Sequence, residues 1–550
     1  MAGMGDRGHR KARGAFFTPP AISRYLVDWA VQSATDSVLE PSCGEASFLL
    51  PAARRLESLP DRSLFAFDQL HGVEIHKESA DQAQALLRAE GFSAKITVSD
   101  FFEYASTDKF SAVVGNPPFV RYQNFSGAAR ARSLEAALAQ GVRLSGLASS
   151  WAAFVVKAAF HVAPEGRLAL VLPAELLSVG YAAEVRRFLL SRFSRVRLIM
   201  FEERVFPEVL EEVVLLLAEG TGGAQCFELH QTRDADSLES VELATWTTHV
   251  PGEDEKWTPA LLAQSAFATY RDLAASSFEE LSAWGSAYLG AVTGNNGFFS
   301  LTADEASKLG LTETDLIRIS PPGSRHMRGL ALTDAAWKQL AREGARCYLL
   351  SPKGEPSAAA LRYIAKGQKD GVATAYKCRV RSPWWRVPLV AAPDLFLTYM
   401  NHDRPRLVTN SVRADILNSI YGVRLTDERR SIGRDLLPVA SLNSVTLLGA
   451  EIVGRAYGGG LLKMEPREAD KLPLPSLERV RTFEKELRLV KPQLAQALRR
   501  GDLMAAVEKV DAILLADVPE ADLKALRIAR EMLFERRRTR GKSGESRRPS

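Results

Sequence analysis

The amino-acid sequence predicts an α/β protein, in which a doubly wound parallel sheet is followed by an α+β domain and a helical C-terminal segment. In residues 1–240, short apolar runs alternate with stretches that place apolar residues at helical spacing, which is typical of a parallel sheet covered by helices. Residues 241–476 lose this alternation and combine short helical pieces with stretches rich in Pro, Gly, Trp and Arg. Residues 477–537 return to strong helical periodicity, and residues 538–550 have the composition of a basic disordered tail.

Six apolar runs in the first domain are the expected strands, and residues 77–91 and 151–163 are the clearest helices between them. The strands are expected at residues 37–39, 65–73, 94–98, 110–114, 167–172 and 213–218. Strand candidates in the second domain are short, and residues 346–350 are an example. Parallel sheets bind ligands beyond the carboxyl ends of their strands, so the polar residues after these runs are the candidate site.

Length and composition indicate a folded chain of several domains. At 550 residues the chain favours two to four folded units, and 46% hydrophobic and 25% charged residues are typical of a globular protein. The longest apolar runs are far shorter than the roughly 20 residues that cross a bilayer, and residues 1–14 lack the apolar core of a secretory signal. We therefore expect a cytoplasmic protein without a membrane partner. Four widely spaced cysteines predict neither a metal site nor disulfides.

The net charge of +5 is unevenly distributed. Residues 1–14 carry +3 and residues 536–550 carry +6, which leaves −4 for the body of the chain. A nucleic-acid contact in the body therefore requires a local basic patch. Residues 371–430 supply one, because ten Lys and Arg residues stand there against five acids.

Candidate ligand-binding features follow the first three expected strands. Glu40 precedes a turn of small residues, including Ser42 and Gly44, which lets a ligand approach the backbone closely. Glu74 ends the next strand, where a carboxylate can bind both hydroxyls of a ribose. Asp100 ends the third, where it can accept a hydrogen bond from an adenine amino group. Taken singly, these features are equally compatible with an ordinary βα turn, helix N-caps and core packing.

The segment Asn116-Pro117-Pro118-Phe119 directly follows the fourth expected strand. Two consecutive prolines stiffen the backbone and remove two N–H donors, so that the Asn116 side-chain oxygen and the Pro117 carbonyl are left as acceptors. Two acceptors suit the two hydrogens of an exocyclic amino group, and Phe119 offers a flat surface on which a base can stack. The alternative is a plain proline-rich turn.

Together these features resemble the N6-adenine DNA methyltransferases that use S-adenosylmethionine, in the arrangement where the cofactor motif comes first and a target-recognition domain follows the catalytic motif. Residues 14–20, 203–207 and 457–466 extend the resemblance. It implies a Rossmann-like methyltransferase sheet and a site-specific enzyme of a restriction-modification system, which flips an adenine out of duplex DNA and methylates its N6. It also allows for a companion restriction endonuclease that acts on the same site.

The resemblance assigns roles residue by residue. Catalysis belongs to Asn116, Pro117, Pro118 and Phe119. The implied cofactor-binding residues are Thr18, Glu40, Ser42, Gly44, Glu74, Ile75, Asp100, Phe101 and Phe154. Phe119 and Phe206 hold the flipped base, and Phe154 packs either on the cofactor adenine or in the core. The family's turn reads Gly-x-Gly, whereas this chain has Ala46 in the second place, and a positive φ there would cost energy.

In the second domain, a segment in which cations alternate with aromatic residues resembles the family's recognition region. The expected DNA-binding residues are Lys377, Arg379, Arg381, Trp384, Trp385 and Arg386. Arg can read guanine, and Asn410 or Asn418 could read adenine. The alternative places both Trp side chains in the core and leaves the Arg side chains to contact phosphate only.

Two other functions are compatible with the sequence. Methyltransferases that act on protein glutamine or on structured RNA share an Asn-Pro-Pro-aromatic loop, although the long region after the sheet favours duplex DNA. A non-catalytic DNA specificity subunit is the second alternative, and the intact loop from Asn116 to Phe119 argues against it.

Overall fold

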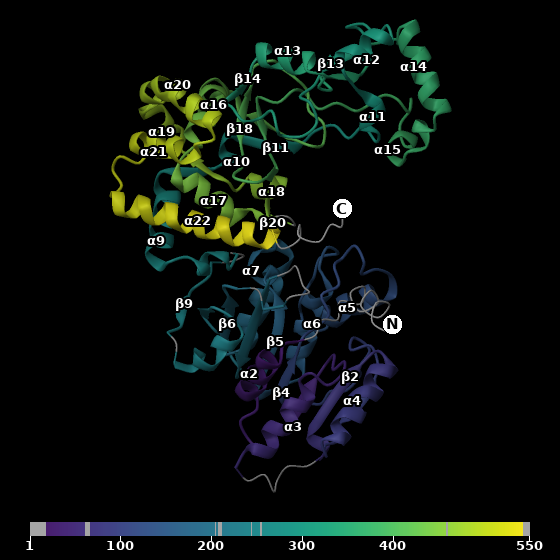
Figure 1. Ribbon diagram of the computed structural model, residues 1–550, viewed down its shortest axis with the longest axis vertical. Helices are drawn as coiled ribbons and strands as arrows, with labels where there is room; N and C mark the ends of the chain where they lie inside the picture. The colour runs from purple at the N-terminus through teal and green to yellow at the C-terminus, as the bar shows by residue number, and fades with distance from the viewer. Residues whose placement is uncertain are drawn as a thin grey trace. The chain divides into compact units, whose positions relative to one another are not determined.

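The computed structural model describes residues 18–60, 67–203, 205–206, 212–243, 245–252, 256–457 and 460–542, and it divides into two compact units, Met1–Leu261 and Leu262–Ser550 (Figure 1). The division falls later than the boundary at residue 240 that the sequence suggested. Two contacts tie the intervening residues to the first unit. β9 (Thr247–His249) pairs with β8 (Phe227–Thr232), and Trp257 stacks on Phe227 at a ring-centroid distance of 4.1 Å.

The first unit contains a nine-stranded sheet in the order β3-β2-β1-β4-β5-β7-β6-β8-β9. Its other strands are β1 (Val38–Glu40), β2 (Leu70–Glu74), β3 (Lys95–Val98), β4 (Phe110–Gly115), β5 (Val162–Pro173), β6 (Arg195–Phe201) and β7 (Val213–Glu219). β1 to β5 are parallel, and β7 lies antiparallel between β5 and β6. The chain runs outward from β1 to β3 and returns to the other side of β1 as β4. In doubly wound sheets, ligands bind at the carboxyl ends of the strands at this reversal.

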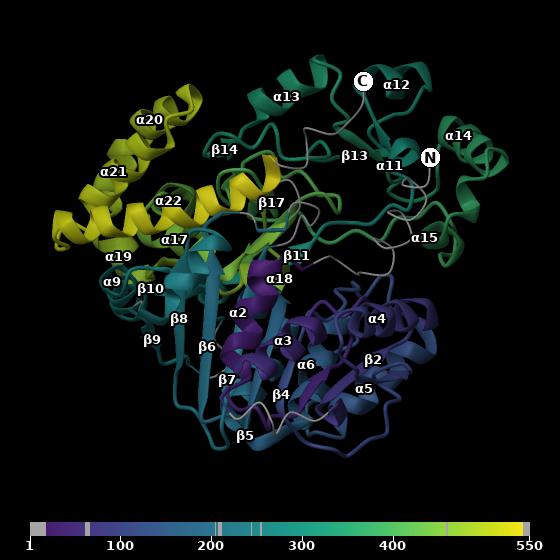
Figure 2. The ribbon, with the colours of Figure 1, turned by 60° about the horizontal axis from the view of Figure 1, so that its bottom comes forward.

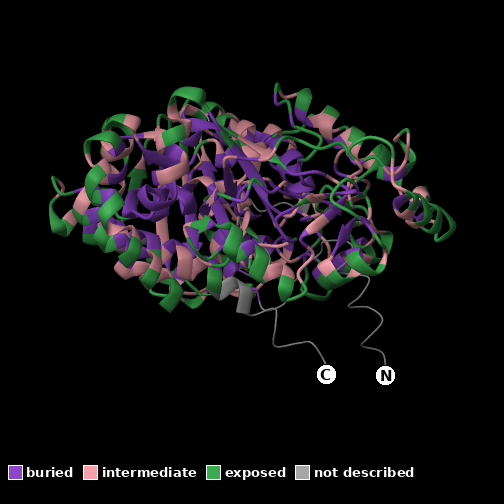
Figure 3. Cartoon of the chain, turned by 90° about the horizontal axis from the view of Figure 1, so that it is seen from above, coloured by how far each residue is buried: buried purple, intermediate pink, exposed green. Residues whose placement is uncertain are grey.

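Helices pack against this sheet (Figure 2). They are α2 (Pro20–Ala30), α3 (Leu49–Ser58), α4 (Lys77–Ala89), α6 (Ser150–Phe160) and α8 (Ala183–Arg192). α5 (Gly127–Leu138) packs against α6, and α7 (Glu175–Ser178) follows β5. Nine of the eleven residues of α6 are buried, so this helix belongs to the core of the unit. Figure 3 shows buried residues concentrated in the strands and exposed residues on the outer sides of the helices.

All six expected strands are present, and the predicted α/β fold class is confirmed. The second expected strand is shorter than its apolar run, because residues 67–69 form a 3-10 helix and residues 61–66 lie outside the described residues. β6 and β8 were not predicted. Arg195 and Arg197 interrupt the apolar pattern of β6, and both contact Glu228 of β8, at 2.8 and 2.7 Å. Charged residues that pair between neighbouring strands thus break the apolar pattern by which these two strands could have been predicted.

The second unit is an α+β structure with four small sheets, in the orders β10-β22, β11-β19-β16-β18-β14, β12-β15-β13 and β17-β21-β20. Its strands are β10 (Phe278–Glu280), β11 (Gly285–Leu289), β12 (Ser300–Leu301), β13 (Leu316–Arg318), β14 (Ala331–Leu332), β15 (Tyr348–Leu350), β16 (Leu395–Leu397), β17 (Met400–Asn401), β18 (Leu407–Asn410), β19 (Tyr421–Leu425), β20 (Arg455–Tyr457), β21 (Leu461–Lys463) and β22 (Pro473–Pro475). β15 lies within the expected strand at residues 346–350.

The helices of the second unit fall into two groups. The first group is α9 (Gln264–Ser276), α10 (Leu281–Trp284), α11 (Asn296–Phe299), α12 (Ala303–Lys308), α13 (Asp334–Arg342), α14 (Ala358–Lys369), α15 (Tyr376–Arg379), α16 (Asp427–Ala440), α17 (Ser444–Val453) and α18 (Pro466–Ala469). The second, expected from helical periodicity, is α19 (Leu477–Thr482), α20 (Glu484–Arg500), α21 (Leu503–Leu514) and α22 (Glu520–Lys542).

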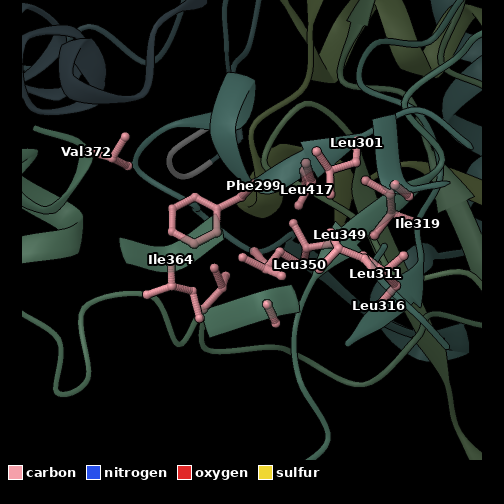
Figure 4. Packing of buried hydrophobic residues seen from close by; sticks show 14 of the residues in the cluster. Phe299, Leu301, Leu311, Leu316, Ile319, Leu349, Leu350, Ile364, Val372 and Leu417 are labelled. Atoms are coloured by element: carbon pink, nitrogen blue, oxygen red, sulfur yellow. The ribbon is translucent and has the colours of Figure 1, made fainter. Parts of the chain in front are cut away.

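Residues between 291 and 420 of this unit form two hydrophobic cores. One gathers around Phe299, Leu349 and Ile364, which come from α11, β15 and α14 (Figure 4). The other gathers around Trp337 and Phe396. The segments that contribute to each core are thus held together by apolar packing.

The C-terminal helices belong to the second unit. Arg537 of α22 forms a buried ion pair with Glu451 of α17, with an N–O distance of 2.7 Å. Because α22 continues to Lys542, the prediction of disorder from residue 538 is wrong for residues 538–542, and residues 543–550 lie outside the described residues.

In the part of the chain that the structure describes, no single helix has the length and apolarity needed to cross a membrane. α16 and α17, bent by 89° at their junction, reach that threshold only as a pair. The same residues contain no group of three or more His, Cys, Asp or Glu side chains that could hold a metal ion.

Candidate active site

Glu40, the last residue of β1, is buried beneath the turn that follows and stabilises it. Its Oε2 accepts hydrogen bonds from the backbone N–H groups of Phe48 and Leu49, at 3.2 and 2.8 Å. These N–H groups lie at the start of α3, where no helical carbonyl is available to them. Burial raises the pKa of the Glu40 carboxyl well above its usual range, against the lowering effect of the two N–H groups, and the charge of Glu74 adds to the increase.

The turn after Glu40 contains two residues with a left-handed backbone, Gly44 at φ 49° and Ala46 at φ 66°. The Gly44 N–H donates to Glu74 Oε2 at 2.9 Å, which joins the ends of β1 and β2. A Cβ added at Gly44 would meet no heavy atom within 4 Å, so the turn faces open space there. Ala46 therefore has the positive φ at which strain was expected, and this left-handed conformation costs an L residue roughly 1–2 kcal/mol.

Glu74 ends β2 with both carboxylate oxygens engaged by backbone donors. Oε2 accepts from Gly44, and Oε1 accepts from the His76 N–H at 2.9 Å. Each carboxylate oxygen has a second lone pair, so Glu74 can still accept hydrogen bonds from a ligand. Ile75, the next residue, exposes 57% of its surface. A polar acceptor and an apolar surface thus follow each other at the end of β2.

Asp100, just after β3, is oriented by two contacts. Its Oδ1 accepts from the Phe102 N–H at 2.9 Å, and its Oδ2 forms an ion pair with Arg132 of α5 at 3.1 Å. Sequence reasoning missed Arg132, because its helical surroundings do not distinguish it from a solvated arginine. The structure therefore places a fixed carboxylate at the end of the third strand, as at the first two.

Phe101 and Phe154 are both buried and pack against each other, with ring centroids 4.7 Å apart. Phe154 also meets Phe102 edge-on at 5.8 Å. This packing favours the core alternative for Phe154. Lys157, one turn further along α6, donates to the carbonyls of Phe102 and Tyr104, at 2.9 Å each. α6 thereby supports the loop after β3.

Asn116, the first residue after β4, has only one end of its side-chain amide engaged. Its Nδ2 donates to Thr18 Oγ1 at 3.1 Å. Its Oδ1 is buried and has no hydrogen-bond partner among the described residues. A buried acceptor without a donor costs free energy and needs an explanation, and a ligand that brings the donor supplies one. Ser42 Oγ donates to the backbone carbonyl of Asn116 at 3.4 Å.

Ser150, the first residue of α6, fixes the other end of the Asn-Pro-Pro-Phe loop. Its Oγ accepts from the Val120 N–H at 2.9 Å and donates to the Pro118 carbonyl, and its own N–H donates to the Val120 carbonyl at 3.0 Å. The carbonyls on either side of Pro117 therefore both accept from serine hydroxyls. Sequence reasoning missed Ser150, whose signal was only a serine at a helix start.

Phe119 and Phe206 are both buried. Arg204 and residues 207–211 lie outside the described residues, as do residues 14–17 and 458–459 of the other family-like segments. The role of Phe206 as the second wall of a base pocket stays a prediction.

The expected DNA-binding residues of the second unit separate into two groups. Arg381 donates to the backbone carbonyls of residues 292 and 293, and Trp384 and Trp385 pack against the core around Phe299. These three side chains hold the fold of the segment, as the alternative for the two Trp residues proposed. Lys377, Arg379 and Arg386 are exposed.

Asn410 is buried, and its side-chain amide is fully used within the protein. It donates to the carbonyls of Pro393 and Ala414, at 2.9 Å each, and accepts from the Ala414 N–H at 3.0 Å. The suggestion that Asn410 could read a base is therefore wrong. Asn418 is partly exposed.

The strand order of the first unit, together with the polar loops after β1 to β4, defines a Rossmann-like methyltransferase domain. Residues 6–222 match the family model described as N-6 DNA Methylase, and residues 254–515 match the model for the C-terminal domain of the Type II methyltransferase M.Eco57I. Two family models thus match most of the chain between them, one for an N-6 DNA methylase domain and one for the C-terminal domain of a Type II methyltransferase, in agreement with the resemblance seen in its motifs.

Two curated proteins are similar along most of their length. Type II methyltransferase M.XamI of Xanthomonas campestris pv. amaranthicola is 27% identical over 495 residues, which cover 86% of this chain and 87% of that protein. Type II methyltransferase M.AccI of Acinetobacter calcoaceticus is 21% identical over 521 residues, which cover 92% and 94%. Among solved structures, the Type IIL restriction-modification enzyme MmeI in complex with DNA is similar in fold, with a TM-score of 0.55 at 14% identity, over 94% of this chain and 75% of that one.

Proposed function

We propose that this chain methylates the N6 amino group of an adenine in duplex DNA, with S-adenosylmethionine as the methyl donor. The observation that carries this proposal is Asn116 Oδ1, a buried acceptor that has no partner among the described residues. A companion endonuclease, which cuts the same site when it is unmethylated, completes the proposed system.

An adenine amino group has two N–H donors, and the loop after β4 offers two acceptors. Asn116 Oδ1 is the first. The Pro117 carbonyl is the proposed second, because the carbonyls of Asn116 and Pro118 already accept from serine hydroxyls. Accepting both hydrogens draws N6 toward tetrahedral geometry and localises its lone pair, which otherwise delocalises into the ring. The acceptors are in place beforehand, so little reorganisation is required during the reaction.

The amino group of cytosine offers the same two donors, and the loop alone does not separate the two bases. The match of residues 6–222 to the N-6 DNA Methylase model supports adenine. Duplex DNA as the substrate is supported by the family and by the DNA-bound state of the MmeI structure.

The residues at the ends of β1 to β3 fit S-adenosylmethionine, which when bound would supply its methyl group as an activated sulfonium. The turn at Gly44 leaves open space for a ligand beside the backbone. Glu74 keeps one lone pair on each oxygen for the ribose hydroxyls, and Ile75 offers an apolar surface next to it. Asp100, held by Arg132, is the proposed acceptor for the adenine amino group of the cofactor. We assign Phe101 and Phe154 to the support of this loop.

The amino group of a paired adenine is enclosed in the duplex, so the base has to leave the stack at a cost of about a few kcal/mol. Phe119 is the proposed stacking surface, and stacking of roughly 1–3 kcal/mol per base offsets part of that cost. The two prolines and the Ser150 hydroxyl restrain the loop that carries Phe119. Catalysis then depends on positioning, because the base and the methyl donor are held beside the carboxyl ends of neighbouring strands in one sheet.

Transfer of radiolabel from S-adenosylmethionine to DNA tests the proposal with two matched variants. Asn116→Ala removes the unpartnered acceptor, and Asn124→Ala removes an exposed amide in the turn that follows. We expect Asn116→Ala to lose about a hundredfold or more in turnover, the usual effect of removing one preorganised polar group. Cofactor affinity, measured by calorimetry, should stay within about twofold of wild type. Asn124→Ala should behave as wild type in both assays.

Near wild-type turnover by Asn116→Ala contradicts the proposed mechanism. RNA and protein extracts serve as alternative substrates, and label in either of them without label in DNA favours the corresponding methyltransferase class. A chain that binds DNA but not the cofactor is a specificity subunit instead.

A further inference from the structure

α15 and the residue that follows it form an exposed surface that the candidate active site does not use. Tyr376 exposes 66% and Val380 exposes 62% of its surface. The two residues are four positions apart, so they lie on the same side of a helical turn. Lys377 and Arg379, which stand between them in the sequence, are also exposed. We call these four residues the α15 surface.

Packing from inside fixes the α15 surface in its exposed position. Cys378 is buried in the core shown in Figure 4, and its Sγ lies 3.6 Å from the Thr293 carbonyl oxygen. Arg381 donates to the same carbonyl at 2.8 Å. A Cβ added at Gly294 would lie only 3.0 Å from the Lys377 Cβ, so the backbones approach closely here. The apolar side chains of Tyr376 and Val380 are thus exposed to solvent on a turn whose backbone is fixed by packing.

The segment of the sequence that contains this surface is strongly positive. Residues 358–392 contain seven Lys and Arg residues and a single acid, Asp370. Within the described residues, no carboxylate lies within ion-pair distance of the Lys377, Arg379 or Arg386 side chains. Lys377 Nζ lies 5.7 Å from the centre of the Tyr376 ring. An apolar centre among unpaired cations complements a polyanion whose grooves expose sugars and bases.

We propose that the α15 surface docks into a groove of duplex DNA, with Tyr376 and Val380 against sugars or base edges and with Lys377 and Arg379 on the flanking phosphates. This inference rests on the proposed function, because it takes DNA as the substrate. Cations on phosphates make binding depend on salt, whereas an inserted aromatic side chain contributes through contact that salt changes little. The contribution of the apolar pair to DNA affinity can therefore be measured separately from that of the two cations.

Binding of a fluorescein-labelled duplex to the full chain, followed over a range of NaCl concentrations, tests the proposal. Tyr376→Ala should weaken binding by about fivefold or more with an unchanged salt slope, and Tyr376→Phe should bind as wild type. The double variant Lys377→Ala/Arg379→Ala should reduce the slope of log Kd against log salt concentration by about two. Leu489→Ala, which removes a 69% exposed apolar side chain from α20, is the matched control and should change nothing.

Equal binding by Tyr376→Ala and wild type overturns the proposal, and so does a salt slope that the double variant leaves unchanged. Unfolding midpoints equal to that of wild type show that the variants are folded. Because binding is measured without cofactor, the result is separable from the proposed function. A wild-type chain that binds DNA through Tyr376 yet transfers no methyl group refutes only the proposed function. A wild-type chain that methylates DNA, with a Tyr376→Ala variant that binds equally well, refutes only the α15 proposal.

Discussion

Asn116 and Thr18 lie 98 residues apart in the sequence, and their side chains are joined by a hydrogen bond of 3.1 Å from Nδ2 to Oγ1. Thr18 is buried just ahead of α2, outside the sheet that carries the rest of the site. The bond occupies the donor end of the Asn116 amide and leaves its Oδ1 as the acceptor. A residue before the first strand therefore sets the orientation of the group to which we assign the chemistry.

Thr18→Val tests this relationship. The variant keeps the shape of the side chain but leaves Asn116 Nδ2 buried without an acceptor, at a cost of about 1–3 kcal/mol. We expect turnover at saturating cofactor to fall roughly tenfold, because the amide is free to rotate. Thr18→Ser keeps the oxygen and should retain most of the activity. Steady-state kinetics at saturating cofactor measures the effect, and equal turnover of Thr18→Val and wild type contradicts the role of Thr18.

Ser150 and Lys157 of α6 contact two different loops, so variants at the two positions should affect different quantities, kcat in one case and the cofactor Kd in the other. Ser150→Ala removes the hydroxyl that engages Val120 and Pro118, so kcat should fall about tenfold with unchanged cofactor affinity. Lys157→Met keeps an apolar stem but removes the donors to the loop after β3, so the cofactor Kd should rise and kcat at saturation should be kept. Calorimetry and turnover measured on both variants check this split, and the reverse pattern would reject it.

The sequence was sufficient to predict six strands of the sheet and the order of the polar loops after β1 to β4, but not β6 or β8. Glu40 and Glu74 end their strands, and Asp100 and Asn116 follow theirs, so the topology alone brings all four to the carboxyl edge of the sheet. It was not sufficient to identify the side chains that hold them. Arg132 acts through a contact with a residue 32 positions away, and such a contact leaves no local pattern.

The second unit was harder to predict for the same reason. Arg381 and Arg379 look alike in the sequence, yet Arg381 donates to backbone carbonyls of a segment almost 90 residues earlier, and Arg379 is exposed. Which cation is structural depends on tertiary packing around Cys378 and the core at Phe299. Periodicity and charge counts do not contain that information.

Ala46 offers a test of backbone strain in the cofactor turn. Ala46→Gly should relieve roughly 1–2 kcal/mol of left-handed strain, but it removes a buried methyl group worth about 0.8 kcal/mol and loosens the unfolded chain by about 0.4–1 kcal/mol. These terms nearly cancel, so we expect almost unchanged stability. Ala46→Val adds a β-branched side chain at a positive φ in a buried place and should destabilise by at least about 2 kcal/mol. Denaturant unfolding measures both, and a stable Ala46→Val would contradict the observed φ.

Asp415 in the second unit predicts a pH dependence of stability. Burial raises the pKa of its carboxyl to about 6. A folded-state pKa above the unfolded value means that the contribution of Asp415 to stability is fully present below the unfolded pKa and is lost as the pH rises through about 6. Asp415→Asn cannot ionise, so its unfolding midpoint should exceed that of wild type at pH 8, and this advantage should shrink toward pH 4. An advantage that is constant over this range contradicts the prediction.

Nucleoside mass spectrometry of a duplex methylated by the purified chain shows directly whether the methyl group reaches adenine N6 and whether Asn116 is required. After incubation with S-adenosylmethionine and digestion to nucleosides, we expect N6-methyladenine as the product, and none above background from Asn116→Ala. Methyl groups on cytosine, or equal amounts of N6-methyladenine from Asn116→Ala and wild type, would contradict this expectation.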